Sequence, residues 1–169
     1  MWSCPLVLLP VPRAMIRRDV LLRQIRQLGE ALAKIVADGP TDQPNAVLDR
    51  LDEALQVHLD GTAADLRTLP PETLLAMCED GDRFDPEAAQ TLAQCLHAQG
   101  KAHRARDERT EAGAAFGRAL LLYRRLLQEP DAPVSWKAGT TIAALVDRVD
   151  TFPVDEAAQE ALDAMRTGT

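Results

Sequence analysis

The sequence predicts an all-α fold, and three observations carry the prediction. Ala and Leu dominate the composition, aromatic residues make up only 4% of the chain, and runs of β-branched residues are nearly absent. Apolar residues recur at steps of three and four through most of the chain. The length of 169 residues, with 46% hydrophobic and 27% charged, fits one globular domain. We expect a bundle of about six to seven helices.

The first expected helix runs from about Ile16 to Ala37, and Gly39-Pro40 ends it. Its apolar residues share one face: Leu21, Ile25, Leu28, Leu32 and Ile35. Such a seam either packs in the core of its own chain or pairs with a second chain as a coiled coil. Because it spans only about two heptads, the core is favoured, and a homodimer through this helix stays the alternative.

The next elements are separated by local stop signals. A second helix begins at Pro44 and ends at Asp60-Gly61, and a short turn or half-helix follows around residues 66–69. A third helix begins at residues 70–72, with Gly81 expected as its left-handed C-terminal cap. Asp85-Pro86-Glu87 combines a capping carboxylate, a first-turn proline and an acid, and predicts the start of a fourth helix.

The fourth helix should run to about residue 105 and a fifth from about 108 to 128. Ser135 should open a sixth helix and Pro153-Val154-Asp155 a short last one. All connections are short, so we expect no second domain. Gly113 and Gly117 lie inside the fifth helix, where small residues indicate close packing.

Small and bulky residues alternate across the fourth and fifth helices in a recognisable pattern: Leu96, Gly100, His103, Ala112, Phe116 and Ala119. The pattern resembles one tetratricopeptide repeat, although Gln99 replaces the expected leucine and Arg124 the expected proline. The resemblance implies two closely packed antiparallel helices with His103 between them and His97 pointing elsewhere. A solenoid groove generally needs about three repeats, and no second copy is present.

A wider resemblance covers about residues 15–150. The start Met15-Ile16-Arg17-Arg18-Asp19, then Gln27-Leu28-Gly29, then the segment Leu51 to Leu55 look like a family of small bacterial proteins of unknown function. The resemblance implies an all-helical bacterial protein and transfers no catalytic residue. The segment before Met15 departs from the sequence pattern of this family.

Residues 1–12 are apolar but hold three prolines and no basic start, unlike a signal peptide, and are too short to span a membrane. We expect translation to begin at Met15, which leaves residues 1–14 as a disordered or misassigned extension and 15–169 as the domain. The net charge of −7 argues against nucleic-acid binding, although residues 13–37 carry six basic and two acidic side chains. Three cysteines without a CxxC pair favour a reduced cytoplasmic compartment.

No motif of an enzyme is present: the sequence lacks a GxSxG elbow, a phosphate loop, a dinucleotide fingerprint and a zincin helix. The acidic run 79–87 lacks the late glutamate of a calcium loop, and the three histidines have no metal-binding spacing. We expect no catalytic residue, no cofactor, no metal and no membrane partner. An unrecognised enzyme would instead show a deep pocket of converging ionisable groups.

The tetratricopeptide-like hairpin therefore suggests a non-enzymatic role in protein–protein interaction, as a scaffold or a regulator, with an unknown protein partner. The exposed face of the fourth and fifth helices is the expected contact surface. The candidate partner-binding residues are Lys101, Arg104, Arg118 and Tyr123.

Overall fold

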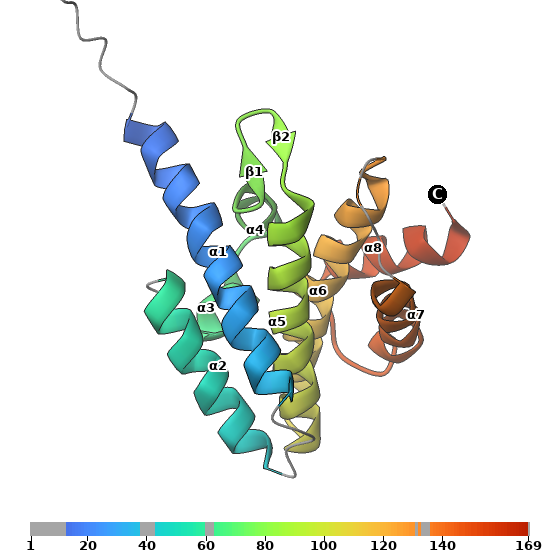
Figure 1. Cartoon of the computed structure of the whole chain (residues 1–169). Helices are drawn as coiled ribbons and strands as arrows, with labels where there is room; N and C mark the ends of the chain where they lie inside the picture. The colour runs from blue at the N-terminus through green and yellow to red at the C-terminus, as the bar shows by residue number, and fades with distance from the viewer. Residues whose placement is uncertain (1–12, 38–42, 60–62, 131, 133–135, 169) are drawn as a thin grey trace, which may run out of the picture.

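The computed structural model describes residues 13–37, 43–59, 63–130, 132 and 136–168. Over these ranges it contains eight helices and one small strand pair (Figure 1). In chain order they are α1 Arg13–Ala37, α2 Pro44–Leu59, α3 Ala63–Thr68, α4 Pro71–Ala76, β1 Glu79–Asp80, β2 Arg83–Phe84, α5 Pro86–Ala105, α6 Arg109–Gln128, α7 Trp136–Val149 and α8 Glu156–Thr167. The all-α prediction is confirmed. The predictions made for residues 1–12, Gly39-Pro40, Asp60-Gly61 and Ser135 lie outside the described residues.

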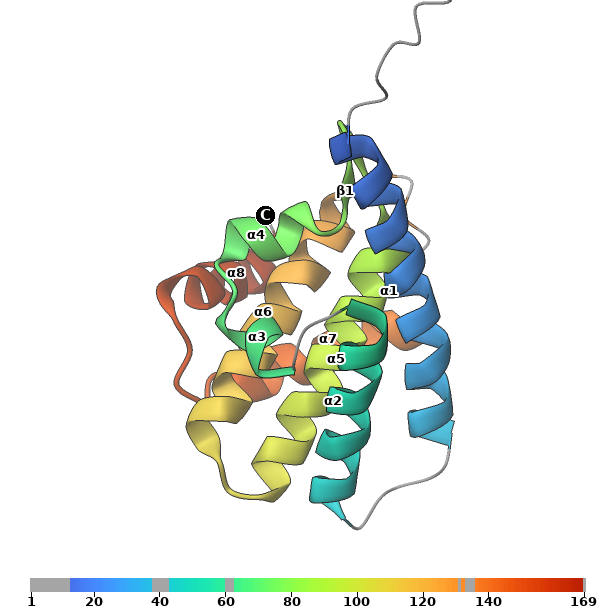
Figure 2. The same cartoon turned by 90° about the vertical axis from the view of Figure 1, so that its left-hand side faces the viewer.

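The antiparallel helices α5 and α6 form the centre of the bundle. Helices α1 and α2 lie side by side against α5, while α7 and α8 pack against α6 (Figures 1 and 2). The short helices α3 and α4 also contact α6. Because α6 touches several neighbouring helices, it has no exposed residue from position 112 to position 120, although its first turn is exposed.

The close approach of α5 and α6 depends on glycine at position 100. A Cβ atom built there would lie 2.5 Å from the Phe116 ring, so only glycine fits. Phe116 is 1% exposed, and Ala112 and Ala119 are fully buried. The predicted close packing of these two helices is confirmed.

Of the two histidines of this region, only His97 is arranged differently from the prediction. His103 is buried, and its Nδ1 lies 2.6 Å from the Glu108 carboxylate at the start of α6. His97, expected to point elsewhere, packs edge-on against Phe116, with ring centroids 5.8 Å apart. The interior of the hairpin is therefore filled by an aromatic contact that the repeat pattern does not contain.

A second set of small residues on α6 admits the chain that leads into α8. A Cβ atom at Gly113 would overlap the carbonyl oxygen of Pro153, and one at Gly117 would lie 2.9 Å from Ala158. The close packing predicted for these glycines is confirmed. Asp155 then starts α8 as predicted, because its carboxylate accepts a hydrogen bond from the Ala158 N–H at 2.9 Å.

The segment between α4 and α5 corrects one prediction. Helix α4 ends at Ala76, and Gly81 does not cap it but lies in the turn of the β1–β2 hairpin, where Asp80 pairs with Arg83. Gly81 does adopt a left-handed conformation, with φ of 63°. A positive φ at the first of two loop residues is typical of a type II′ hairpin turn. The start of α5 is as predicted: Asp85 accepts a hydrogen bond from the Ala88 N–H at 3.0 Å.

The apolar seam of α1 faces the core of its own chain. Ile25 and Leu28 are fully buried and Leu32 nearly so, and α1 packs on α2 and α5. Of the two arrangements open for this helix, the structure therefore has the core-facing one. Leu21 and Ile35, at the two ends of the seam, are half-buried.

Candidate functional site

The structure separates the four predicted contact residues into two pairs. Lys101 and Arg104 are exposed on α5. Arg118 and Tyr123 are only 9% and 1% exposed, so their placement on an exposed face is wrong. The reason is that α6 is covered on the side where these residues lie.

Arg118 and Tyr123 have structural surroundings. The Nε of Arg118 donates to the Leu69 carbonyl oxygen at 2.9 Å, and one terminal nitrogen contacts the Asp155 carboxylate at 2.6 Å. This guanidinium therefore joins α6 to the start of α4 and the start of α8. Burial raises the pKa of Tyr123 to about 12, so its phenol stays neutral at ordinary pH.

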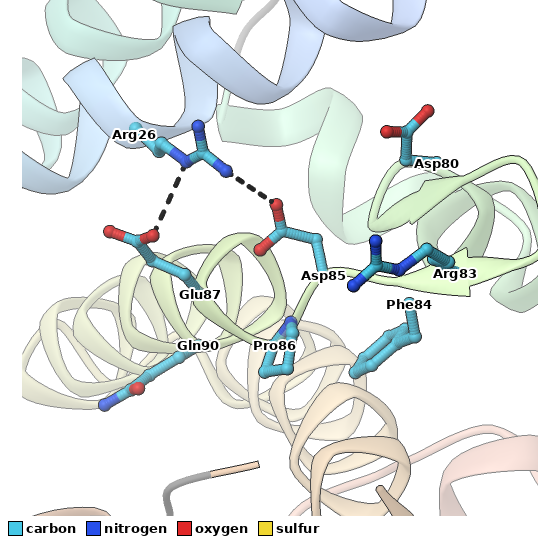
Figure 3. A pocket seen from close by; sticks show the side chains of 8 residues that line it. All are labelled: Arg26, Asp80, Arg83, Phe84, Asp85, Pro86, Glu87 and Gln90. Atoms are coloured by element: carbon cyan, nitrogen blue, oxygen red, sulfur yellow. Dashed lines mark hydrogen bonds and ion pairs between the residues drawn. The ribbon is translucent and has the colours of Figure 1, made fainter. Parts of the chain in front are cut away.

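A charged hollow of about 580 Å³ lies where α1, the β1–β2 hairpin and the start of α5 meet (Figure 3). Arg26 extends from α1 and contacts two carboxylates, Asp85 at 3.1 Å and Glu87 at 3.4 Å. Asp85 already caps α5, so the same carboxylate ties α1 to this helix. The guanidinium carbon of Arg125 lies 4.3 Å from the centroid of the Phe84 ring, and the same guanidinium pairs with the Glu129 carboxylate. These charges neutralise one another, and they hold the hairpin and α1 in place.

A second hollow, of about 560 Å³, is mainly apolar and lies between α6, α7 and α8. We call it the α6–α8 groove. Its lining residues come from one stripe on each helix: Arg124, Leu127, Gln128, Gly139, Ile142, Ala143, Val146, Asp147, Ala164, Met165 and Gly168. Leu127 is 49% exposed there, one of three large hydrophobic side chains that stand open among the described residues. The size is that of a typical ligand or side-chain pocket.

One polar group in this groove lacks a partner. The Nε of Arg124 is buried, and no hydrogen-bond acceptor contacts it among the described residues. Gln99 has both polar atoms of its amide in the same condition, but it is fully buried on α5 and lines neither hollow. Buried donors without acceptors are rare in folded proteins. The Nε of Arg67 is in the same condition outside the groove, so a buried nitrogen without an acceptor does not single out this surface.

The two described cysteines lie in the interior of the bundle. Cys78 and Cys95 are buried, and burial raises the pKa of each thiol to about 12, which leaves both protonated and unreactive. Among the described residues, no three His, Cys, Asp or Glu side chains come together as a metal site would require. None of the described helices has an apolar run long enough to cross a membrane.

His97 is the one histidine whose protonation the structure clearly opposes. Burial, together with the positive charges of Lys101, Arg148 and Arg104, lowers the pKa of His97 from 6.5 to about 4. In the unfolded chain the imidazole takes up its proton near pH 6.5, whereas in the fold it does so only near pH 4. Protonation between these two pH values therefore favours the unfolded chain. The stabilisation of the fold that comes from neutral His97 is complete above pH 6.5 and is lost as the pH falls toward 4.

We expect this histidine to lower the free energy of unfolding by about 3 kcal/mol over that interval. Urea unfolding of the wild type and of His97→Gln, each at pH 7 and pH 4.5, measures the effect as the difference between the two pH dependences. The titration of the carboxylates contributes equally to the pH dependence of both proteins, so it cancels when one pH dependence is subtracted from the other. An equal pH dependence in the two proteins would show that His97 protonates freely in the fold.

The sequence contains a partial signal for the α6–α8 groove. Helix α7 is apolar around a wide arc: Leu145 and Val149 are buried in the core, while Ile142, Ala143 and Val146 line the groove. An amphipathic helix that packs on one side needs a narrower arc of apolar residues.

A comparison with known protein families, with curated proteins and with solved structures finds no match to this chain.

Proposed function

We propose that this chain is a non-enzymatic protein-interaction module, a scaffold or a regulator, and that its partner docks in the α6–α8 groove. The observation that carries the proposal is the groove itself: an apolar hollow between three helices with Leu127 half exposed at its edge. Covering a leucine, valine or methionine side chain completely is worth about 1.5–3 kcal/mol. Leu127 is 49% exposed, whereas Val146 and Met165 are already half-buried, so docking gains only the part of this value that the exposed surface still offers.

The charge distribution supports the choice of this surface. In the hairpin hollow, Arg26 satisfies Asp85 and Glu87, so a ligand there would have to compete with existing ion pairs. The lining of the groove is mainly apolar, so a partner that docks there gains by covering apolar surface. The exposed residues Lys101 and Arg104 remain candidates for additional contacts outside the groove.

A tetratricopeptide-like character of α5 and α6 and a cytoplasmic location belong to the same proposal. The first is supported by the glycine and alanine positions that bring the two helices together. The second is supported by the free thiols of Cys78 and Cys95. Self-assembly through the apolar seam of α1 is not proposed, since most of that seam is buried within the chain.

We expect Val146→Glu to abolish partner binding, because it places a carboxylate among apolar side chains at the centre of the groove. Val57→Glu is the matched control: it makes the same change on α2, where Val57 is 68% exposed. The full chain and both variants, each immobilised, are incubated with extract from cells that make the protein, and bound proteins are quantified by mass spectrometry. Circular dichroism confirms that each variant is folded.

The expected result is a set of proteins retained by the wild type and Val57→Glu and lost from Val146→Glu. If partner proteins were lost only from Val57→Glu, the docking surface would lie at α2 on the opposite side of the bundle. Identical capture by all three proteins would refute docking in the groove.

A further inference from the structure

A groove of about 600 Å³ lies between α1 and α2 on the outer surface of the bundle. We call it the α1–α2 groove. It faces away from α7 and α8, so a contact there does not compete with docking in the α6–α8 groove (Figure 1). Val57 lines it and is 68% exposed, more than any other large hydrophobic side chain in the described ranges. The other apolar residues of its lining are Ala31, Ile35 and Ala54.

Charged residues divide the α1–α2 groove into an acidic end and a basic end. Helices α1 and α2 run antiparallel (Figures 1 and 2), so the later residues of α1 lie beside the earlier residues of α2. Glu30 on α1 is therefore next to Glu53 on α2. Lys34 is likewise next to Arg50, and all four residues are exposed. Within one copy of the chain, each end of the groove thus brings like charges together, which repel each other.

The chain does not neutralise these charges locally. The ion pairs formed among the described residues do not include Glu30, Lys34 or Glu53. The charged hollow beside the β1–β2 hairpin differs in this respect, because Arg26 contacts two carboxylates there. The α1–α2 groove therefore offers acids and a base to a partner that carries the opposite pattern.

A second copy of the chain carries that opposite pattern. In a dimer with two-fold symmetry, the same patch of both copies meets. When the two-fold axis crosses the groove at right angles to the helices, the acidic end of one copy lies on the basic end of the other. Glu30 then faces Lys34 of the second copy, and each such pair occurs twice. Glu53 faces Arg50 of the second copy in the same way. An axis parallel to the helices would place Glu30 against Glu53 of the second copy, and the charges oppose that arrangement.

The apolar residues agree with the same arrangement. Ala46, Arg50, Glu53 and Val57 are spaced four, three and four residues apart, so they form one stripe of α2. The axis that pairs Arg50 with Glu53 also places Val57 opposite Ala46 of the second copy, so apolar surface covers apolar surface. We infer that the α1–α2 groove binds the same groove of a second copy, which joins α1 and α2 of both chains in an antiparallel four-helix contact.

The test exchanges the charges of the groove in the full-length chain and follows association by analytical ultracentrifugation from micromolar to submillimolar concentrations. The wild type should shift from monomer to dimer over this range. A basic variant, Glu30→Lys with Glu53→Lys, and an acidic variant, Lys34→Glu with Arg50→Glu, should each self-associate about a hundredfold more weakly, because each places like charges across the axis. An equimolar mixture of the two variants should form the dimer again, because their grooves are complementary.

The matched control is Glu111→Lys with Glu160→Lys, which makes the same change of net charge as the basic variant at exposed positions of α6 and α8. The control should associate like the wild type, and circular dichroism confirms that each variant is folded. The wild-type dimer should also weaken as the salt concentration rises.

Four results would overturn the inference: a wild type that stays monomeric, a dimer that persists in both groove variants, a mixture that stays monomeric, and a control that associates as weakly as the basic variant. None of them bears on the proposed function. Val57→Glu separates the two surfaces, because it should weaken the dimer and still retain the proteins captured by the α6–α8 groove. A dimer unchanged in Val57→Glu would contradict the contact between Val57 and the second copy.

Discussion

Replacing Phe116 with alanine is expected to lower the free energy of unfolding by about 3–5 kcal/mol. The ring is 1% exposed and fills the space over Gly100, where it also contacts His97 and Phe152. Truncation leaves a cavity in the centre of the α5–α6 hairpin that rigid helix backbones cannot close. Urea unfolding followed by circular dichroism measures the loss.

Two further variants make this prediction specific. Leu127→Ala shortens a half-exposed side chain on the same helix and should cost less than about 1 kcal/mol. Gly100→Ala should be strongly destabilising in the wild type but neutral or stabilising beside Phe116→Ala, because its Cβ collides only with that ring. Additive effects of the Gly100 and Phe116 substitutions would contradict the contact between them.

Replacing Gly113 with alanine is expected to destabilise the protein by about 3 kcal/mol, at the upper end of the usual cost of overpacking. The added Cβ would overlap the carbonyl oxygen of Pro153, and a backbone atom cannot turn aside as a flexible side chain can. The segment before α8 would have to move away from α6. Thermal unfolding of the variant provides the measurement.

The matched control is Gly139→Ala, the same change in a helix at an exposed position. A Cβ there meets nothing within 4 Å, so the higher helix propensity of alanine should stabilise the protein by up to about 1 kcal/mol. Opposite signs for two identical substitutions are the expected outcome. Two variants with the same stability would mean that α8 does not sit tightly on α6.

The helices could be predicted from local sequence because their end signals act locally. Asp85 and Asp155 cap helices through hydrogen bonds to residues three positions ahead, which any folded arrangement would keep. The small residues of α5 and α6 predicted close packing for the same reason: glycine at position 100 leaves room that only a neighbour can fill. Gly81 shows the limit, since a left-handed glycine suits a helix end and a hairpin turn equally well.

The surface could not be predicted in the same way. An exposed face is inferred from polar residues on one side of a helix, but α6 carries Arg118 on a side that α3, α4 and α8 cover. The α6–α8 groove depends on the relative placement of three helices, which no spacing within one helix encodes. Arg124 was notable in the sequence only as a departure from a repeat pattern, and its unbonded Nε becomes visible only when α7 and α8 are in place.

The position of Arg118 has a consequence for how the chain reaches this fold. Its guanidinium takes its two acceptors from residues 69 and 155, which lie 49 and 37 positions away on opposite sides of it in the sequence. Until both of these segments have packed against α6, the guanidinium would be enclosed with only part of its hydrogen bonds. Early and late regions of the polypeptide are thereby coupled, which favours assembly and disassembly of the bundle as one cooperative unit.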